Sequence, residues 1–228
     1  PESPTERLEL AGMNDIPPEA IPPWEAEWTL FGPIANEGDS SNWPGKLGWD
    51  PLPLDAATEI PAEITIEGQV YRPQKTFSPD GLLDFDAIFG PTPGAPMVYL
   101  LQEIDSPEAA RLPIAFGANW GTEWWLNGEL VYETRVGNFG DWHLRNSHQF
   151  EAPLQPGRNL LVVRVISGGA NDWTMTVGHL PPRPGGSAEA LPVQLPILSP
   201  LRQRTRDYTA TGLRIEERPA PPPVEVAA

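Results

Sequence analysis

Two pairs of carboxylates in this sequence have a spacing that glycosidase chemistry could use. Asp84 and Asp86 form one pair, and Glu103 and Asp105 form the other. In a β-strand the members of each pair share one face, and glycoside hydrolysis requires two carboxyl groups around one bond. The chain has 31 acidic residues, and acidic side chains commonly solvate strand edges. We interpret both pairs as surface charge, with glycoside hydrolase or lyase activity as an alternative.

The segment 135–148 carries Asp141, His143 and His148, which offer oxygen and nitrogen ligands to a metal. No second ligand motif accompanies them, so we interpret the segment as a solvated loop and predict no metal and no cofactor. The chain has no Cys, and nucleophile elbow, Walker, zinc-protease and dinucleotide motifs are all absent from it. The sequence therefore predicts a protein that is not an enzyme.

Tryptophans are the strongest candidates for ligand binding. Trp120 and Trp142 each lie in a predicted loop next to glycine, where an exposed indole stacks on a sugar or anchors a protein partner; simple loop packing is the alternative. Trp124 and Trp125 are adjacent in a predicted strand, so they point to opposite faces. Trp124 is in phase with Leu126 and is predicted to be core, which leaves Trp125 on the open or partner-facing side.

A third candidate is basic. Arg202, Arg204 and Arg206 alternate with other residues, so in an extended chain their guanidinium groups lie on one side. There they can bind carboxylates or phosphates of a partner. The alternative is a charge cluster that keeps a linker soluble.

Charge and hydropathy exclude several classes of function. The net charge of −16 argues against nucleic-acid binding and against adhesion to anionic lipid. No apolar run reaches the roughly 20 residues of a transmembrane helix. The chain begins at Pro1, and we expect a removed signal peptide or a trimmed start, with a periplasmic or extracellular location.

Thirty Pro and 21 Gly disfavour long helices and favour short strands between turns. We read residues 106–111 as a turn rather than a helix. The candidate strands are residues 62–72, 97–104, 111–118, 122–127, 129–134, 159–166 and 172–178.

Two turn signals locate strand ends. Asn127-Gly128 between apolar residues is typical of a type I′ hairpin, and Pro156-Gly157 precedes a strand. In that strand Leu161, Val163 and Val165 share one face, and residues 160, 162, 164 and 166 share the other. Both faces are largely apolar, which predicts a central strand covered on both sides.

Composition divides the chain into three parts. Residues 1–23 are rich in proline and acid and predict an extended arm, with no core before Trp24. Residues 24–180 hold the predicted sandwich domain. Residues 181–228 are a proline-rich linker and tail.

The order of features over residues 97–178 resembles the galactose-binding-like jelly roll. The resemblance rests on the strands at 97–104 and 111–117, on Glu123-Trp-Trp-Leu-Asn-Gly128, and on Pro156-Gly-Arg-Asn-Leu-Leu-Val-Val-Arg-Val165. With Trp28-Thr-Leu-Phe-Gly-Pro33 it extends over residues 28–178 and is closest to the sugar-binding sandwich of family 2 glycoside hydrolases and related secreted bacterial modules. It implies an all-β, antiparallel β-sandwich between two proline-rich arms. Ala118-Asn-Trp-Gly121 stands where such modules often carry Asp, so no calcium or sugar site is carried over.

Two functions follow as hypotheses. The first is a non-catalytic accessory or structural subunit of a larger extracytoplasmic assembly, either membrane-associated or not, which contacts other protein subunits through the sandwich and both arms. The second is a carbohydrate-binding module of a polysaccharide-degrading system, with Trp120, Trp125 and Trp142 as stacking residues.

Overall fold

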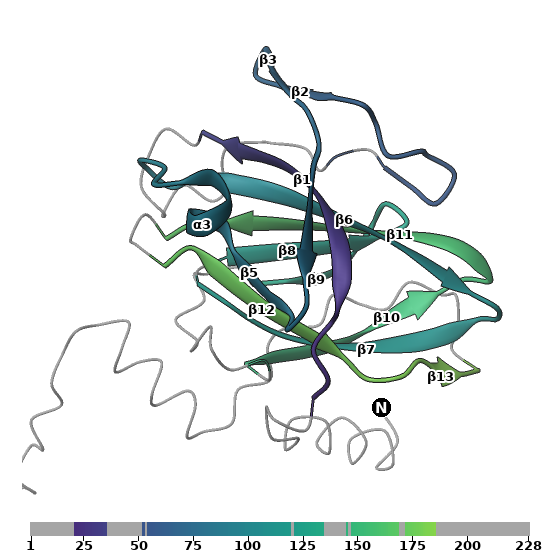
Figure 1. The fold of residues 1–228 in the computed structure, drawn as a ribbon. Coiled ribbons are helices and arrows are strands. Elements are labelled where there is room, and N and C mark those ends of the chain that lie inside the picture. Colours follow the sequence, from purple (N-terminus) through teal and green to yellow (C-terminus); the bar gives the residue numbers. More distant parts are fainter. Residues whose placement is uncertain are drawn as a thin grey trace, which may run out of the picture. The chain divides into compact units, whose positions relative to one another are not determined.

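A computed structural model of the chain describes residues 21–35, 52, 54–119, 121–134, 145, 147–168 and 172–185. These residues form two antiparallel sheets packed face to face and a small separate hairpin (Figure 1). This confirms the predicted all-β antiparallel sandwich.

The six-stranded sheet has the order β4-β1-β6-β11-β8-β9. Its strands are β4 (Gln74–Ser78), β1 (Ala26–Ile34), β6 (Met97–Ser106), β11 (Gly157–Ile166), β8 (Gly121–Leu126) and β9 (Glu129–Glu133). The five-stranded sheet comprises β10 (His148–Leu154), β7 (Ala110–Ala118), β12 (Thr174–His179), β5 (Leu82–Asp84) and β13 (Arg183–Pro184), which pairs with β7. The remaining elements are the hairpin β2 (Ile64–Ile66) and β3 (Gln69–Tyr71) and the short helix α3 (Phe85–Phe89).

β11 is buried on both faces, as its sequence predicts. Leu161, Val163 and Val165 belong to the core between the two sheets, together with Trp124. Leu160, Val162 and Ile166 belong to a second cluster on the outer face of the six-stranded sheet. The apolar pattern of β11 therefore reflects two separate cores.

The second cluster exists because residues 54–71 cover part of that outer face. Leu54, Ile64 and Tyr71 pack there against the sheet. The single strand predicted over 62–72 is wrong in detail, because Glu67 and Gly68 take positive φ values of 50° and 80°. That turn splits the segment into the hairpin β2–β3.

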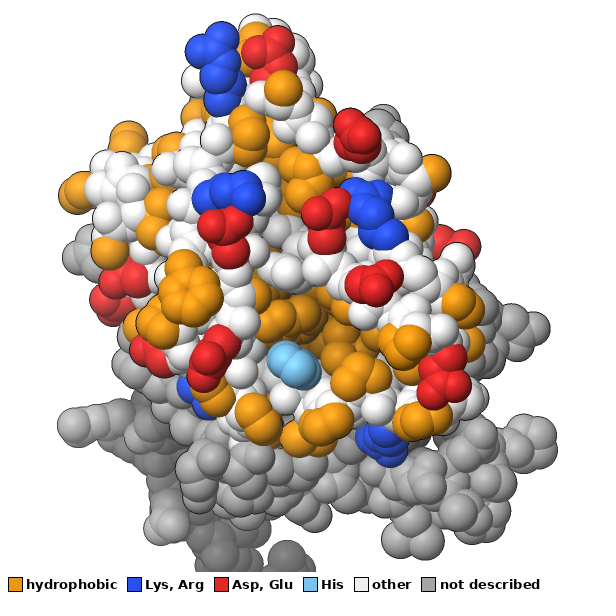
Figure 2. All heavy atoms as spheres, turned by 45° about the vertical axis from the view of Figure 1, so that its right-hand side comes forward, with side chains coloured by type: hydrophobic (Ala, Val, Ile, Leu, Met, Phe, Trp, Pro, Cys, Tyr) orange, Lys and Arg blue, Asp and Glu red, His pale blue; other side chains and the backbone are white. Residues whose placement is uncertain are grey.

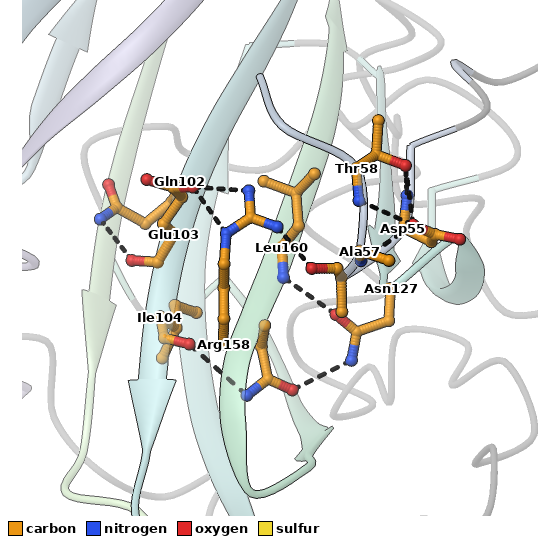
Figure 3. A network of polar contacts seen from close by, with 11 residues as sticks. Asp55, Ala57, Thr58, Gln102, Glu103, Ile104, Asn127, Arg158 and Leu160 are labelled. Atoms are coloured by element: carbon orange, nitrogen blue, oxygen red, sulfur yellow. Dashed lines mark hydrogen bonds and ion pairs between the residues drawn. The ribbon is translucent and has the colours of Figure 1, made fainter. Parts of the chain in front are cut away.

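The predicted hairpin turn is confirmed. Asn127 and Gly128 have φ values of 53° and 87°, as a type I′ turn requires. The Asn127 side chain accepts from the Leu160 amide at 2.9 Å and donates to Asn159 Oδ1 at 3.0 Å. These bonds fix the β8–β9 turn to the start of β11 (Figure 3).

Strand β10 is absent from the strands predicted from the sequence, and it contains Pro153. Proline lacks an N–H and is tolerated at a sheet edge, and β10 is the first strand in its sheet order. A turn between two strands is confirmed within the predicted range 106–111, but it is shorter than predicted and spans 107–109, because β6 ends at Ser106 and β7 begins at Ala110. β1, β4, β5 and α3 are elements that the sequence did not delimit.

The expectation of no core before Trp24 is wrong at one residue. Ile21 is 2% exposed, and Pro23 forms a β-bridge with Gly178. The Arg145 guanidinium donates to the Ile21 carbonyl at 3.0 Å and to the Asp80 carbonyl at 2.8 Å. The described end of the N-terminal arm is therefore bound to the sandwich itself; residues 1–20 and 186–228 lie outside the described residues.

Candidate functional site

A groove opens where β1 and β6 part. Their pairing ends at Thr29 and Leu101, whereas β6 continues beside β11 as far as Ser106. β1 instead leads back to the other sheet, where the Trp24 amide donates to the Val177 carbonyl at 3.0 Å. The two strands diverge, and the sheet is interrupted between them.

The groove has a volume of about 860 Å³. Figure 2 shows a hollow with hydrophobic surface inside it and acidic and basic side chains on the surface around it. Residues from three strands and from the segment 60–62 line it; they are Trp24, Glu25, Ala26, Glu27, Thr29, Ile60, Pro61, Ala62, Pro73, Lys75, Leu101, Gln102 and Glu103. The site thus combines an apolar interior with a polar rim.

Two ion pairs stand at this rim. Lys75 Nζ lies 2.5 Å from Glu27 Oε1, and this hydrogen bond with Glu27, assisted by its charge, raises the pKa of Lys75. Arg158 Nε donates to Glu103 Oε1 at 2.7 Å, and Arg158 also reaches the Ala56 carbonyl. Figure 3 shows Arg158 between Glu103 and the segment 55–58, so this pair also fastens the covering segment to the sheet.

The groove also holds a buried acceptor that is not satisfied. Gln102 Nε2 donates to the Glu103 carbonyl at 3.1 Å, but Gln102 Oε1 is buried without a hydrogen-bond partner. Gln102 is one of the lining residues, so this acceptor lies in the wall of the groove. Trp28 Nε1 is also buried and unbonded, but Trp28 belongs to the core between the two sheets and does not line the groove.

Glu25 is an exposed carboxylate at the mouth of the groove. Unlike Glu27 and Glu103, it forms no hydrogen bond or ion pair with any residue that the structure describes. It is therefore available to a ligand.

Of the predicted binding residues, only Trp125 can be placed. It lies on the face opposite Trp124, as predicted, but that face is covered and Trp125 is 6% exposed. Its ring packs 5.1 Å from the Arg164 guanidinium carbon. The expectation of an open or partner-facing side is thus corrected, because residues 54–71 cover it. Trp120, Trp142, Arg202, Arg204 and Arg206 lie outside the described residues.

Beside Trp125 lies a buried charged cluster. Arg164 is 2% exposed and binds Glu123, which is 5% exposed. Arg164 Nη1 also donates to the Tyr99 hydroxyl at 3.0 Å. Burial raises the pKa of Tyr99, against the opposing effect of the Arg164 charge. These side chains bond one another beneath the cover, so their role is structural.

Two of the four candidate carboxylates bond to backbone amides. Asp84 caps α3 by accepting from the Ala87 amide at 2.9 Å, and Asp86 accepts from the amides of Asp172 and Trp173 at 3.0 and 2.8 Å. Asp84 and Asp86 thus hold backbone segments in place and do not simply solvate strand edges as expected. Of the four, Glu103 alone lines the groove.

His148 is not part of a solvated loop. It is 2% exposed at the start of β10, lies 2.8 Å from the Tyr132 hydroxyl through Nδ1 and stacks on Phe116. Asp141 and His143 lie outside the described residues. In the described part of the chain, no three His, Asp or Glu side chains are grouped as a metal site, and no helix is long and apolar enough to span a membrane.

Sequence reasoning missed the groove residues Glu25, Glu27, Lys75 and Gln102. A local signal for them does not exist, because the groove arises where β1 leaves β6 for a strand about 150 residues further along the chain. Only Glu103 was singled out from the sequence, for its spacing from Asp105.

Comparison with known proteins gives distant likenesses only. No family model and no curated sequence matches the chain. Among solved structures, it is similar to part of a GH31 alpha-xylosidase from Xanthomonas citri (16% identity, TM-score 0.40, 74% of this chain and 16% of that one). It is also similar to parts of a beta-glucosidase from Kluyveromyces marxianus in complex with glucose (11%, 0.39, 72% and 17%) and of a Faecalibacterium prausnitzii beta-glucuronidase (17%, 0.35, 62% and 20%).

The chain spans no more than about a fifth of each of these enzymes. Likenesses this distant assign neither a family nor a ligand.

Proposed function

We propose that this sandwich is a non-catalytic carbohydrate-binding module whose ligand enters the groove between β1 and β6. A sugar ring presents hydroxyl groups around its edge and apolar C–H faces. The groove offers a matching surface, since carboxylates, an amide and an ammonium group stand around an apolar interior that includes Trp24 and Leu101. Few polar groups around an apolar cleft are typical of small-molecule sites.

The observation that carries the proposal is the unsatisfied acceptor Gln102 Oε1, on a residue that lines the groove. A buried polar group without a partner costs about 1–3 kcal/mol. A hydroxyl group is both a donor and an acceptor, so a ligand hydroxyl that enters the wall of the groove can donate to Gln102 Oε1. Binding would then remove a cost that the free protein carries.

The ion pairs at the rim favour binding over hydrolysis. Glycoside hydrolysis requires a carboxylic acid that delivers a proton, opposite a second carboxylate. Glu27 and Glu103 are instead each bonded to a cation, Lys75 and Arg158. Such pairs are suited to holding sugar hydroxyls, because charged partners make the stronger hydrogen bonds.

The second candidate is the accessory subunit of an extracytoplasmic assembly. It is favoured by Phe77, which is 63% exposed on β4 at the end of the sheet order and could anchor a partner. We favour carbohydrate binding over the subunit role because Pro23 and β13, the described ends of both arms, pair with this chain's own strands. Deleting residues 199–228 tests the subunit role: unchanged co-purification with native partners would count against it.

The test of carbohydrate binding is titration calorimetry with a panel of soluble oligosaccharides, on wild type and two matched variants. Gln102→Met removes the unsatisfied acceptor at similar volume and is expected to weaken binding about five- to tenfold. Gln149→Met is the control, because Gln149 is also buried and unbonded at its amide but lies on β10 of the other sheet. Absence of binding to every oligosaccharide would refute the proposal, and equal losses in both variants would move the site elsewhere.

A further inference from the structure

The charges that line the groove are unequal. Three carboxylates, on Glu25, Glu27 and Glu103, face one ammonium group, on Lys75. Arg158 contributes a second cation from beside the groove. Both cations are already paired with carboxylates, Lys75 with Glu27 and Arg158 with Glu103, so within the described ranges one carboxylate charge of the groove has no cation opposite it.

Glu25 is the exception among these carboxylates. It is exposed, lines the groove next to Trp24, and has no bonded partner among the residues that the structure describes. A ligand cation placed here gains an ion pair at no cost to an existing one. A ligand anion would meet Glu25 directly, and the like charges would repel.

The unsatisfied acceptor is compatible with the same ligand. Gln102 Oε1 accepts hydrogen bonds only, and an ammonium group has three donors and no acceptor. The groove therefore presents the carboxylate oxygens of Glu25, Glu27 and Glu103 to its ligand, and the buried amide oxygen of Gln102 lies in its wall. Acceptors outnumber donors at the rim.

We infer that the groove selects sugars that carry an ammonium group, such as 2-amino-2-deoxy hexoses, over neutral sugars, and discriminates against uronic acids. This inference rests on the proposed carbohydrate-binding function and specifies its ligand class. Replacing one sugar hydroxyl by an ammonium group keeps the ring's shape and adds a positive charge that can pair with the Glu25 carboxylate. A uronic acid instead carries a carboxylate on the ring, and its negative charge would be repelled by Glu25.

The test uses two matched sugar series. Glucose, glucosamine and glucuronic acid form one series, and the corresponding galacto compounds form the other, as short oligosaccharides measured by calorimetry at about pH 6, where an amine of this kind is protonated. The amino sugar is expected to bind up to about fivefold more tightly than the neutral sugar, the gain of an exposed ion pair. The gain should vanish in about 1 M salt and as pH rises past about 8.

Two variants locate the effect. Glu25→Gln is expected to abolish the preference for the amino sugar while it preserves binding of the neutral one. Glu129→Gln is the matched control, because Glu129 is also exposed but lies on β9, at the other end of the six-stranded sheet. The preference of Glu129→Gln for the amino sugar over the neutral sugar should equal that of wild type.

The possible failures are distinguishable. If no sugar of either series binds, the proposed function itself is wrong. If neutral and amino sugars bind equally, the carbohydrate-binding function stands and the inference is overturned. If spermine, a cation without a sugar ring, displaces the amino sugar at equal concentration, charge alone accounts for binding and the inference is also overturned.

Discussion

Asn159 offers the sharpest test of how this sandwich is held together. It is 0% exposed, and its carboxamide joins the Gln155–Gly157 turn to the β8–β9 hairpin. Nδ2 donates to the carbonyls of Gln155 and Gly157 at 2.8 and 3.0 Å. Oδ1 accepts from the Gln155 amide and from Asn127 Nδ2 at 2.9 and 3.0 Å.

Asn159→Ala removes these four bonds at once. At a net value of about 1 kcal/mol for each, the free energy of unfolding is expected to fall by about 4 kcal/mol. Urea unfolding at neutral pH measures this, provided that the m-value stays unchanged. The comparison is Asn119→Ala, which loses one bond, from Nδ2 to the Asp172 carbonyl at 2.7 Å, and should cost about 1 kcal/mol. Equal losses in the two variants would refute the reasoning.

Two further predictions concern backbone space and pH. In Gly81→Ala the new Cβ would lie 2.1 Å from the Val177 carbonyl oxygen, whereas in Gly68→Ala the new Cβ meets nothing within 4 Å. Both glycines have positive φ, so the backbone strain is shared and the clash is the difference. Thermal unfolding should therefore show that Gly81→Ala lowers the free energy of unfolding more than Gly68→Ala does, by about 2 kcal/mol or more. Burial raises the pKa of Tyr99, so the folded state keeps this proton above about pH 10 where the unfolded chain releases it. The contribution of the protonated Tyr99 hydroxyl to the free energy of unfolding is complete below that pH and is lost above it. The difference in free energy of unfolding between wild type and Tyr99→Phe should therefore narrow as pH rises through 10. A constant difference would contradict this.

The parts of the fold that the sequence predicts are those fixed by neighbouring residues. The Asn127-Gly128 turn needs only two residues that tolerate positive φ. The opposite directions of Trp124 and Trp125 follow from strand geometry alone. Asn159 lies in the stretch 156–165 on which the resemblance rests, and its side chain is satisfied by hydrogen bonds within the chain itself.

The site was not predictable in the same way. The groove depends on where β1 stops pairing with β6, and this follows from contacts of Pro23 and Trp24 with β12, remote in sequence. The burial of Trp125 likewise depends on a cover that comes from residues 54–71. Periodicity shows which face a side chain takes, but it does not show what lies above that face.

The path of β1 also determines how the domain responds to a mechanical load. A pull on Ile21 acts along a strand that touches both sheets, through Gly178 on one side and through β4 and β6 on the other. The five residue pairs between β1 and β4 are then loaded together in shear and do not open one by one. A chain tethered through its N-terminus would therefore transmit tension into the body of the sandwich before any strand peels away.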